Sequence, residues 1–380
     1  MTGKVPSVLV TTPLPVPYQV ELFDALAASG KVELTVLYEW LRHSDRSWEL
    51  PQLGHTYRVL DGMRDEESRD LVHRCDLAVF SGYQGAEVRR LIRTRAASGR
   101  AWCFWGERPG FRLPQWLGRH YRAVMLPDLR RRDIPIWGIG SWAVAGYRLE
   151  FGDTRYMTSI PYFSRLNDFL AIDRKAANEE PRRILFSGSL IDRKGVDLLM
   201  RAFLAIADEH PALELHLIGD GPLREPLQRL AAGKPSRVHF HGFRQWNELA
   251  LFYAEADILC APSRYDGWGL IVPEGLAAGL LVISTDRTGA AVDLIGPDIG
   301  WVVEANRLEP LVSALRAAAA TKGSERIARI ARGRAHAAAQ DVTAGVPRVL
   351  KAIDETLAAF TTTTTSSALD ARFAAQGNAS

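Results

Sequence analysis

Short apolar runs alternate with segments of helical period along most of this sequence, and this alternation limits the fold more than any single motif. The first-half runs with strand character are 5–12, 32–38, 76–81 and 101–105. Between the first two runs, Val20, Phe23 and Leu26 repeat at helical spacing, and a basic helical segment covers 86–97. Strand, helix and strand in this order predict a βαβ unit with parallel strands. The first half is therefore expected to be a doubly wound α/β domain.

A second series of alternating elements follows the polar stretch 176–182. Its apolar runs are 183–187, 213–219, 238–241, 257–262 and 281–285. A chain of 380 residues exceeds the usual size of one hydrophobic core, so two domains are expected. We predict an N-terminal Rossmann-like domain, a linker, a C-terminal Rossmann-like domain, a helix that could pack back on the N-terminal domain and a disordered low-complexity tail. These five segments are 1–163, 164–181, 182–345, 346–360 and 361–380.

Charge, cysteine content and hydropathy limit what this protein could bind and where it could be located. A net charge of +3 is too small to indicate nucleic-acid binding. Cys75, Cys103 and Cys260 are far apart and form no metal-binding motif, which fits a reducing cytoplasm and predicts no zinc site. No segment approaches the roughly 20 apolar residues of a membrane-spanning helix, and the start has no signal-peptide pattern. We expect a cytoplasmic protein, at most peripheral to the membrane.

Arginines concentrate in one part of the first half with few acidic residues among them. They are Arg89, Arg90, Arg93, Arg95, Arg100, Arg108, Arg112, Arg119, Arg122, Arg130, Arg131 and Arg132. Such a cluster could meet anionic lipid headgroups at the inner face of a membrane, or an acidic substrate. It could equally be an ordinary solvated surface.

A glycine-bearing loop with two carboxylates joins a buried strand to a helix in the second half. Asp266 begins the loop, and Glu274 lies in the helix, which is expected to start with Pro273. Gly267 and Gly269 allow close approach of the backbone to a ligand, and the helix N-terminus favours an anion. The loop could therefore hold a phosphorylated donor. The alternative is a plain strand–helix corner in which Glu274 complements the helix dipole.

Three further residues stand at strand ends, where doubly wound sheets bind ligands. Lys194 lies between a strand and a helix N-terminus, so its ammonium could hold a diphosphate, or it could be an ordinary solvated lysine. Glu107 and Arg108 follow another strand. They could form a general acid–base and phosphate-binding pair, or a local ion pair that stiffens the turn.

Two weaker patterns are interpreted as structural. Residues 138–143 match the dinucleotide-binding pattern, but no acidic residue follows at the distance of a ribose contact. Ser141 is instead expected to cap a helix. His239 and His241 lie two apart on a strand and share a face, but no third metal ligand can be assigned to them.

Four separated motifs in the second half occur together in a recognisable order. They are Phe186-Ser-Gly-Ser-Leu190 with Arg193-Lys-Gly195, Leu217-Ile-Gly-Asp-Gly-Pro222, His241-Gly-Phe243 and the stretch from Ser263 to Gly275. Together they resemble the nucleotide-sugar-binding half of retaining glycosyltransferases of family 4, which have the GT-B architecture. The resemblance covers about 182–293 and is loose over the first half.

The resemblance implies an α/β GT-B fold of two Rossmann-like domains whose parallel sheets face each other across a deep cleft. It implies a metal-independent, hexosyltransferase-like enzyme without a cofactor, whose co-substrate is a UDP- or GDP-type sugar. The acceptor would be a hydroxyl group, on a lipid-linked or cell-surface glycan precursor. A catalytically silent nucleotide-sugar-binding protein is the alternative, and a nicotinamide-dependent oxidoreductase or epimerase using 138–143 is a second one.

The resemblance also assigns roles to residues. Asp266 would face hydroxyls of the donor sugar, Glu274 the ribose and Lys194 the diphosphate, while the nucleobase would pack near Phe243. The implied catalytic residues are Asp266 and Lys194, with Glu107 and Arg108 at the comparable strand end of the first half. The implied donor-binding residues are Ser189, Arg193, Lys194, Phe243, Gly267, Trp268, Gly269, Leu270 and Glu274, with no metal ligand.

The sequence departs from the family pattern at several places, and a histidine that the family often has near the donor in the N-terminal domain has no obvious match. Asp266 stands where the family usually has Glu, so its carboxylate reaches about one methylene less far. Ser189 stands where an arginine is expected, and Arg193 could supply the missing charge. The first loop carries Pro13, Pro15 and Pro17 in place of a glycine pair.

Overall fold

The chain forms two compact units, and the first contains both chain ends. The structure, a computed structural model, describes residues 4–42, 49–109, 115–131, 134–174 and 180–377, with side chains up to Phe360 apart from those of Gln115 and Arg131. The first unit comprises Met1–Phe163 and Gly345–Ser380, and the second comprises Ser164–Ala344. Each unit has its own sheet and its own core.

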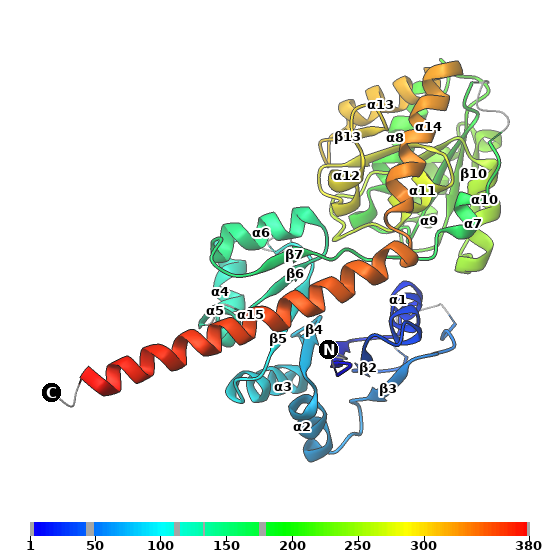
Figure 1. Cartoon of the computed structure of the whole chain (residues 1–380). Coiled ribbons are helices and arrows are strands. Elements are labelled where there is room, and N and C mark those ends of the chain that lie inside the picture. Colours follow the sequence, from blue (N-terminus) through cyan, green and yellow to red (C-terminus); the bar gives the residue numbers. More distant parts are fainter. Residues whose placement is uncertain (1–3, 43–48, 110–114, 132–133, 175–179, 378–380) are drawn as a thin grey trace. The chain divides into compact units, whose positions relative to one another are not determined.

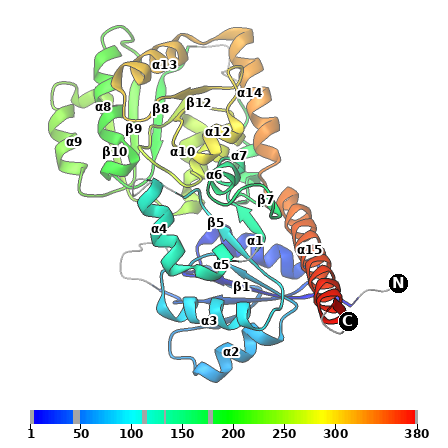
Figure 2. The ribbon, with the colours of Figure 1, turned by 90° about the vertical axis from the view of Figure 1, so that its left-hand side faces the viewer.

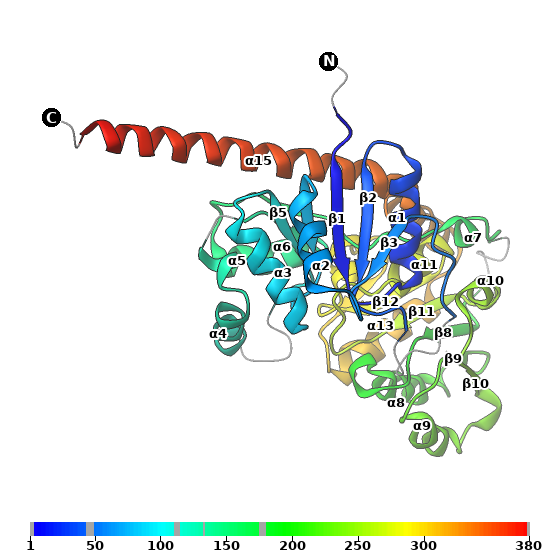
Figure 3. The same cartoon turned by 90° about the horizontal axis from the view of Figure 1, so that it is seen from below.

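The first unit is built on a seven-stranded parallel sheet of order β3-β2-β1-β4-β5-β6-β7 (Figures 1 and 3). Its strands are β1 (Ser7–Thr12), β2 (Glu33–Tyr38), β3 (Thr56–Val59), β4 (Leu77–Phe80), β5 (Trp102–Gly106), β6 (Ile136–Gly138) and β7 (Met157–Ser159). Its helices are α1 (Pro17–Ala28), α2 (Asp65–Arg74), α3 (Ala86–Ala97), α4 (Gln115–Met125), α5 (Pro127–Arg131), α6 (Ser141–Phe151) and α15 (Val342–Gly377). The strand order reverses beside β1, which pairs with both β2 and β4.

The central strands of this sheet are apolar on both faces because helices cover both sides. Every residue of Leu77–Phe80 is buried, as is every residue of Trp102–Gly106. Helices α2 and α3 lie on one side of the sheet (Figure 2). Val72 of α2 and Leu91 of α3 pack into the same core as Phe80 and Phe104. The arginine cluster contributes to this packing. Arg95 is fully buried and donates hydrogen bonds to the carbonyls of Val72, Cys75, Asp76 and Ala101.

The second unit is built on a six-stranded parallel sheet of order β10-β9-β8-β11-β12-β13. Its strands are β8 (Arg183–Ser187), β9 (Glu214–Ile218), β10 (Val238–Gly242), β11 (Ile258–Ala261), β12 (Leu281–Thr285) and β13 (Trp301–Val303). Its α-helices are α7 (Asn167–Leu170), α8 (Val196–Ile206), α9 (Arg224–Ala231), α10 (Leu249–Glu255), α11 (Ile271–Ala277), α12 (Gly289–Leu294), α13 (Leu308–Ala320) and α14 (Gly323–Ala338). Short 3-10 helices are η1 (Asp192–Lys194), η2 (Pro235–Arg237) and η3 (Trp246–Glu248).

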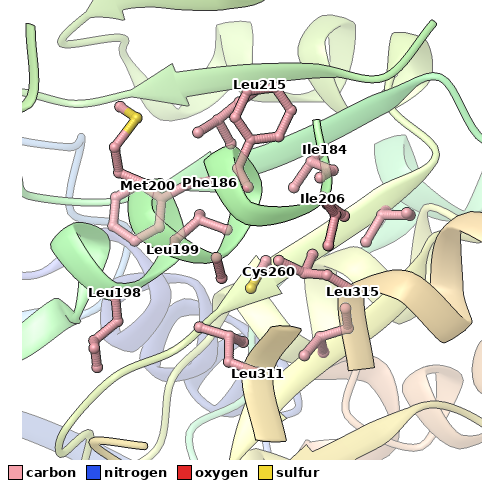
Figure 4. Close-up of a cluster of buried hydrophobic side chains, with 14 of the residues drawn as sticks. Ile184, Phe186, Leu198, Leu199, Met200, Ile206, Leu215, Cys260, Leu311 and Leu315 are labelled. Atoms are coloured by element: carbon pink, nitrogen blue, oxygen red, sulfur yellow. The ribbon is translucent and has the colours of Figure 1, made fainter. Parts of the chain in front are cut away.

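One face of this second sheet is covered by α8, α9 and α13. Their apolar side chains join Ile184, Leu215, Ile258 and Ile283 from four strands in a single core (Figure 4). On the other face, α11 packs so closely that a Cβ on Gly275 would lie 2.4 Å from a methyl carbon of Leu259. Because both faces are covered, the strand ends and the loops after them are where ligands have access.

The two parallel sheets with interleaved helices confirm the α/β class that the alternation of elements predicts. Four short strands, β3, β6, β7 and β13, were not identified from the sequence, because four or three residues carry too little periodicity. Two helix starts also differ from expectation. Pro273 is the third residue of α11, where its missing N–H has no helical acceptor. Gly140 occupies the N-cap of α6, so Ser141 is its first residue.

The segment 164–181, where a linker is expected, includes the short helix α7. Arg174 donates hydrogen bonds to the carbonyls of Tyr253, Ala254, Ala256 and Ala278, so this part of the segment is attached to the second unit. Residues 175–179 lie outside the described part of the chain.

Helix α15 packs on the first unit near its start. The indole N–H of Trp137 donates to the hydroxyl oxygen of Thr356 over 3.0 Å, and Thr356 is fully buried. The helix continues to Gly377, through the threonine-rich segment for which the sequence predicts disorder. Once a helix has formed, each further residue that takes the helical conformation adds one hydrogen bond, which favours continuation of the helix. Among the described helices, none is both long enough and apolar enough to cross a bilayer.

Candidate functional site

Lys194 and Asp266 form an ion pair at the point where the strand order of the second sheet reverses. Lys194 follows β8 and Asp266 follows β11, and these two strands are neighbours. The Lys194 Nζ lies 2.5 Å from Asp266 Oδ2, and the two side chains are 17% and 14% exposed. Charges so far removed from water attract each other and a bound ligand more strongly than surface charges do. The reversal point of a doubly wound sheet is also where ligands bind in such folds.

Arg193 brings a second positive charge to the same carboxylate. Its guanidinium donates to the carbonyl of Tyr265 over 3.0 Å and lies 3.9 Å from Asp266 Oδ2. The loop of Ser189 is close as well, because a Cβ on Gly188 would lie 4.0 Å from Lys194 Cε. Arg193 and Lys194 of one predicted motif and Asp266 of another are thus brought together, with Ser189 exposed beside them.

Glycines allow the loops after neighbouring strands to touch. Gly195 has φ +67°, and a Cβ there would lie 2.1 Å from the carbonyl oxygen of Pro262. The turn that carries Lys194 is therefore pressed against the end of β11. Similarly, a Cβ on Gly219 would lie 1.9 Å from the carbonyl oxygen of Gly188. No residue other than glycine fits either contact without a backbone shift.

The loop between Asp266 and α11 is held from one side and leaves its amides free on the other. The Asp266 amide donates to the Arg287 carbonyl over 2.9 Å, and the Trp268 carbonyl accepts from the Ala290 amide over 2.8 Å. Within the described part of the chain, the amides of 267–270 donate to no protein acceptor. Unpaired N–H groups beside a Lys–Asp pair favour an anion. Gly267, Trp268 and Gly269 are buried and Leu270 is half-buried, so the loop is closely packed at this point.

Glu274 is held from a neighbouring helix by a tyrosine that sequence reasoning missed. The Tyr253 hydroxyl, on α10, donates to Glu274 Oε2 over 2.9 Å. Burial raises the pKa of Tyr253 well above its usual range and the Glu274 charge adds to this, so the hydroxyl stays protonated and can donate. Phe169 packs edge-on against the Tyr253 ring, with centroids 4.9 Å apart. In the sequence, Tyr253 looks like an ordinary core aromatic of a helix.

A second missed residue is Arg224, at the start of α9. It forms an ion pair of 3.0 Å with Asp220 in the Gly219–Pro222 turn. A Cβ on Gly242 would lie 3.6 Å from its Nη1, so the guanidinium is near the end of β10. Phe243 follows directly and its side chain is 46% exposed. The sequence could have indicated this residue, because it is an arginine at the start of a helix shortly after a glycine-rich turn.

The loop of Asp266 is also tied to α8 by a bidentate ion pair. Arg264 donates to both carboxylate oxygens of Asp197, over 2.7 and 2.8 Å. Burial acts to raise the pKa of Asp197, but the hydrogen bonds and charge of Arg264 outweigh it, and the pKa is lowered. Both parts of the site, after β8 and after β11, are therefore fixed to one helix.

Glu107 and Arg108 belong to the first unit. The Arg108 guanidinium lies over the Trp142 ring, 4.5 Å from its centroid, and donates to the Trp142 carbonyl over 3.1 Å. The Glu107 carbonyl accepts from the Tyr147 hydroxyl over 2.8 Å, while its side chain is exposed. These contacts with α6 favour a local structural role for Arg108. The glycine pattern at 138–143 allows close packing against the same helix, α6, since a Cβ on Gly138 would lie 2.7 Å from the Val144 amide nitrogen.

Residues 169–334, which lie almost wholly in the second unit, match the model of the family described as glycosyl transferases group 1. The chain is 32% identical over 146 residues to the sulfoquinovosyl transferase SQD2 of Arabidopsis thaliana, covering 37% of this chain and 28% of the relative. It is 30% identical over 164 residues to a GDP-mannose-dependent monoacylated alpha-(1-6)-phosphatidylinositol monomannoside mannosyltransferase of Corynebacterium glutamicum, covering 41% and 42%. The matched part thus spans less than half of each relative.

Whole-chain similarity exists at the level of structure. HepE of Anabaena, solved in complex with UDP and glucose, superposes with a TM-score of 0.70 over 92% of this chain and 100% of that chain, at 14% sequence identity. At this identity the similarity shows the fold alone. The expected GT-B fold of two Rossmann-like domains is thereby confirmed.

Proposed function

We propose that this chain, a GT-B protein with a glycosyl transferases group 1 domain, is a retaining glycosyltransferase of family 4. It would move a sugar from a UDP- or GDP-type donor to a hydroxyl acceptor. The observation that carries the proposal is the Lys194–Asp266 pair at the reversal point of the second sheet, beside loop amides that donate to no described protein acceptor. Support for the two bases comes from the UDP of HepE and the GDP-mannose of the Corynebacterium glutamicum relative.

Each part of the site has a proposed role. Lys194 and Arg193 hold the diphosphate, and the amides of 267–270 contact phosphate and sugar. Asp266 orients sugar hydroxyls, and Glu274, fixed by Tyr253, receives the ribose hydroxyls. The exposed ring of Phe243 offers a surface on which a base can stack.

The proposed reaction breaks the bond between the anomeric carbon and the diphosphate oxygen, and the electron pair leaves with the diphosphate. The acceptor oxygen bonds to the anomeric carbon on the same face, and its proton passes to the leaving phosphate. Positive side chains and amides stabilise the negative charge that develops, without a metal ion or cofactor. Asp266 fixes the anomeric carbon relative to the acceptor, which raises the rate by orientation.

We propose a lipid-linked acceptor, such as a cell-surface glycan precursor, and contact with the inner face of a membrane. Helix α4 presents one exposed face that includes Trp116, Leu117, Tyr121 and Val124. Trp116 is 69% exposed and Val124 63%, which is unusual for a soluble surface. A helix with an aromatic and aliphatic face suits the membrane interface. The mannosyltransferase relative acts, by its name, on a phosphatidylinositol mannoside.

The arginine cluster supports this contact less than its size suggests. Arg122 forms a buried ion pair with Glu150, and Arg90 pairs with Asp65. Arg89 donates to the carbonyls of Tyr83 and Gln84. Arg112 and Arg132 lie outside the described residues. The proposed membrane contact therefore depends mainly on the apolar face of α4.

The test combines binding with turnover on the full chain. UDP- and GDP-hexoses are screened by thermal shift, and hydrolysis and transfer of the best donor are then measured. We expect one class of donor to raise Tm, and Lys194→Ala and Glu274→Gln to lower turnover at least tenfold while the circular dichroism spectrum is kept. Lys234→Ala is the matched control, because Lys234 pairs with the exposed Asp208 in the same unit. A donor-induced shift without any turnover would identify a silent binding protein. No shift with any donor would contradict the proposal.

A further inference from the structure

A cluster of three histidines and a glutamate lies on the second sheet, away from the loops described above. Glu214 and His216 are two residues apart on β9, and His239 and His241 are two apart on the edge strand β10. Side chains two apart on a strand share a face. Parallel pairing places His239 directly opposite His216, so all four side chains point to one face of the sheet. Between them, Leu215 points to the opposite face and into the core.

The spacing of three of these groups suits a metal ion. The Nε2 of His216 lies 3.1 Å and the Nε2 of His239 lies 3.7 Å from Oε2 of Glu214. All three ligand atoms are within 4.8 Å of one another. In a tetrahedral zinc site with bonds of about 2.0 to 2.1 Å, neighbouring ligand atoms are about 3.3 Å apart. The observed distances are on both sides of this value, so small side-chain rotations close the site.

The cluster is not satisfied by its own hydrogen bonds. His239 Nε2 is buried and has no hydrogen-bond partner among the described residues. A buried polar nitrogen without a partner costs free energy, and native structures rarely leave one. Among the described residues, the arginine that pairs with Glu214 is Arg183, at 3.9 Å, and Arg183 has a closer acidic partner in Glu255 at 2.7 Å. Both observations point to a missing positive group between the two strands.

The surroundings of the cluster resemble the outer shell of a metal site. His216 Nδ1 lies 3.0 Å from His241 Nε2, and the two rings are stacked. When the proton of this hydrogen bond is on His216 Nδ1, the lone pair of His216 Nε2 is left for a metal. Outer hydrogen bonds of this kind orient metal-binding histidines. Phe252 of α10 packs edge-on against His241 and limits its movement.

We propose that Glu214, His216 and His239 bind a divalent transition-metal ion of the zinc type, with water as the fourth ligand and His241 as a positioning residue. Two imidazoles and one carboxylate favour Zn²⁺ or its neighbours over Mg²⁺ and Ca²⁺, which prefer all-oxygen sites. The ion would join the edge strand β10 to β9. It would thereby stabilise the strand that leads into Gly242 and Phe243. This proposal does not depend on sugar transfer.

The test measures Zn²⁺ binding to the untagged full chain after dialysis against a chelator. We expect isothermal titration calorimetry to show one ion bound per chain. In thermal denaturation, the bound ion should raise Tm. Glu214→Gln and His239→Gln should weaken binding at least tenfold, and His241→Gln about tenfold to a hundredfold. His73→Gln is the matched control, because His73 is exposed on α2 of the first unit. Unchanged affinity in Glu214→Gln and His239→Gln would overturn the proposal, as would the absence of one-to-one binding to the unaltered chain.

The unaltered chain provides a second measurement if these variants fold poorly. One equivalent of Co²⁺ should give the intense visible absorption of a four-coordinate site, and Zn²⁺ should abolish it by displacement. Only the weak absorption of six-coordinate Co²⁺ would overturn the proposed ligand set. None of these measurements uses a sugar donor, so failure here and failure of the proposed transferase activity are distinguishable.

Discussion

The hydroxyl of Tyr253 on α10 donates to the carboxylate of Glu274 on α11 over 2.9 Å, within the second unit. Because Glu274 is the proposed ribose contact, we expect Tyr253→Phe to weaken donor binding about threefold to tenfold. A loss of about 0.5 to 1.5 kcal/mol, typical of one intramolecular hydrogen bond, corresponds to roughly this range. Titration calorimetry with the preferred nucleotide measures the effect. Tyr156→Phe is the matched control, because the Tyr156 hydroxyl bonds Glu355 in the first unit. Equal loss in both variants would contradict the specific role of Tyr253.

Gly195 holds the Lys194 turn against the end of β11. Gly195→Ala should destabilise the second unit by about 2 to 5 kcal/mol, because a left-handed alanine costs about 1 to 2 kcal/mol and the overlap with Pro262 costs about 1 to 3 kcal/mol more. Urea denaturation measures this loss. The control is Gly323→Ala, where φ is also positive, at +60°, but nothing lies within 4 Å of the added Cβ. Its cost should be the backbone part alone, and equal costs at the two positions would show that the contact with Pro262 contributes nothing.

The apolar face of α4 should govern binding to vesicles. We expect Trp116→Ser combined with Val124→Ser to weaken sedimentation with phosphatidylglycerol vesicles at least about tenfold, since full burial of each side chain contributes about 1.5 to 3 kcal/mol. Leu251→Ser is the control, because Leu251 is 71% exposed on α10 in the second unit. Binding that depends on anionic lipid but is unaffected by the double variant would assign the contact to arginines instead.

Asp76 should make the first unit sensitive to acid. It accepts hydrogen bonds from the Ser7 amide and the Ser7 hydroxyl, both over 2.9 Å, and the amide bond is the main cause of its lowered pKa. A carboxyl whose pKa is lower in the folded state adds stability above its unfolded pKa of about 3.9. That stability is lost as the pH falls through the folded value. Asp76→Asn cannot titrate, so urea denaturation between about pH 5 and about pH 3 should show a flatter decline than in the unaltered chain. An identical decline would exclude Asp76 as its cause.

Thr356 tests the attachment of α15. Its hydroxyl accepts from the Trp137 indole in a fully buried position, so Thr356→Val should cost about 1 to 3 kcal/mol by leaving that N–H without a partner. Thermal denaturation followed by tryptophan fluorescence measures the change. Thr158→Val is a comparison on β7, where Thr158 is only half-buried, and it should cost less.

The sequence was sufficient to predict the class of fold and the core of the candidate site. The alternating apolar runs predict both parallel sheets, because strands covered on both faces must be continuously apolar. Lys194 and Arg193 were predicted from one motif and Asp266 from another, and the structure brings them to neighbouring strand ends. These motifs contain glycine because their backbones touch a neighbouring loop, where a side chain would not fit.

Other features depend on pairing between distant segments and could not be predicted. Tyr253 contacts Glu274 only because the fold brings these two residues of α10 and α11 together, and nothing in the sequence around Tyr253 indicates this. Glu214 and His216 become neighbours of His239 through the pairing of β9 with β10. From the sequence, His239 and His241 were interpreted as structural because no third metal ligand could be assigned to them. For Arg108, the choice between an active-site role and local packing depended on the position of Trp142.

The first unit is interrupted in sequence by the whole of the second. Its sheet is complete with β7, but Thr356 lies on α15, which follows the second unit in the chain. Domains usually fold in the order in which they leave the ribosome. Here the continuous second unit can finish folding before the first, because Trp137 finds its partner only after the second unit has been synthesised. During synthesis, therefore, the unit that begins earlier is completed after the unit inserted in it.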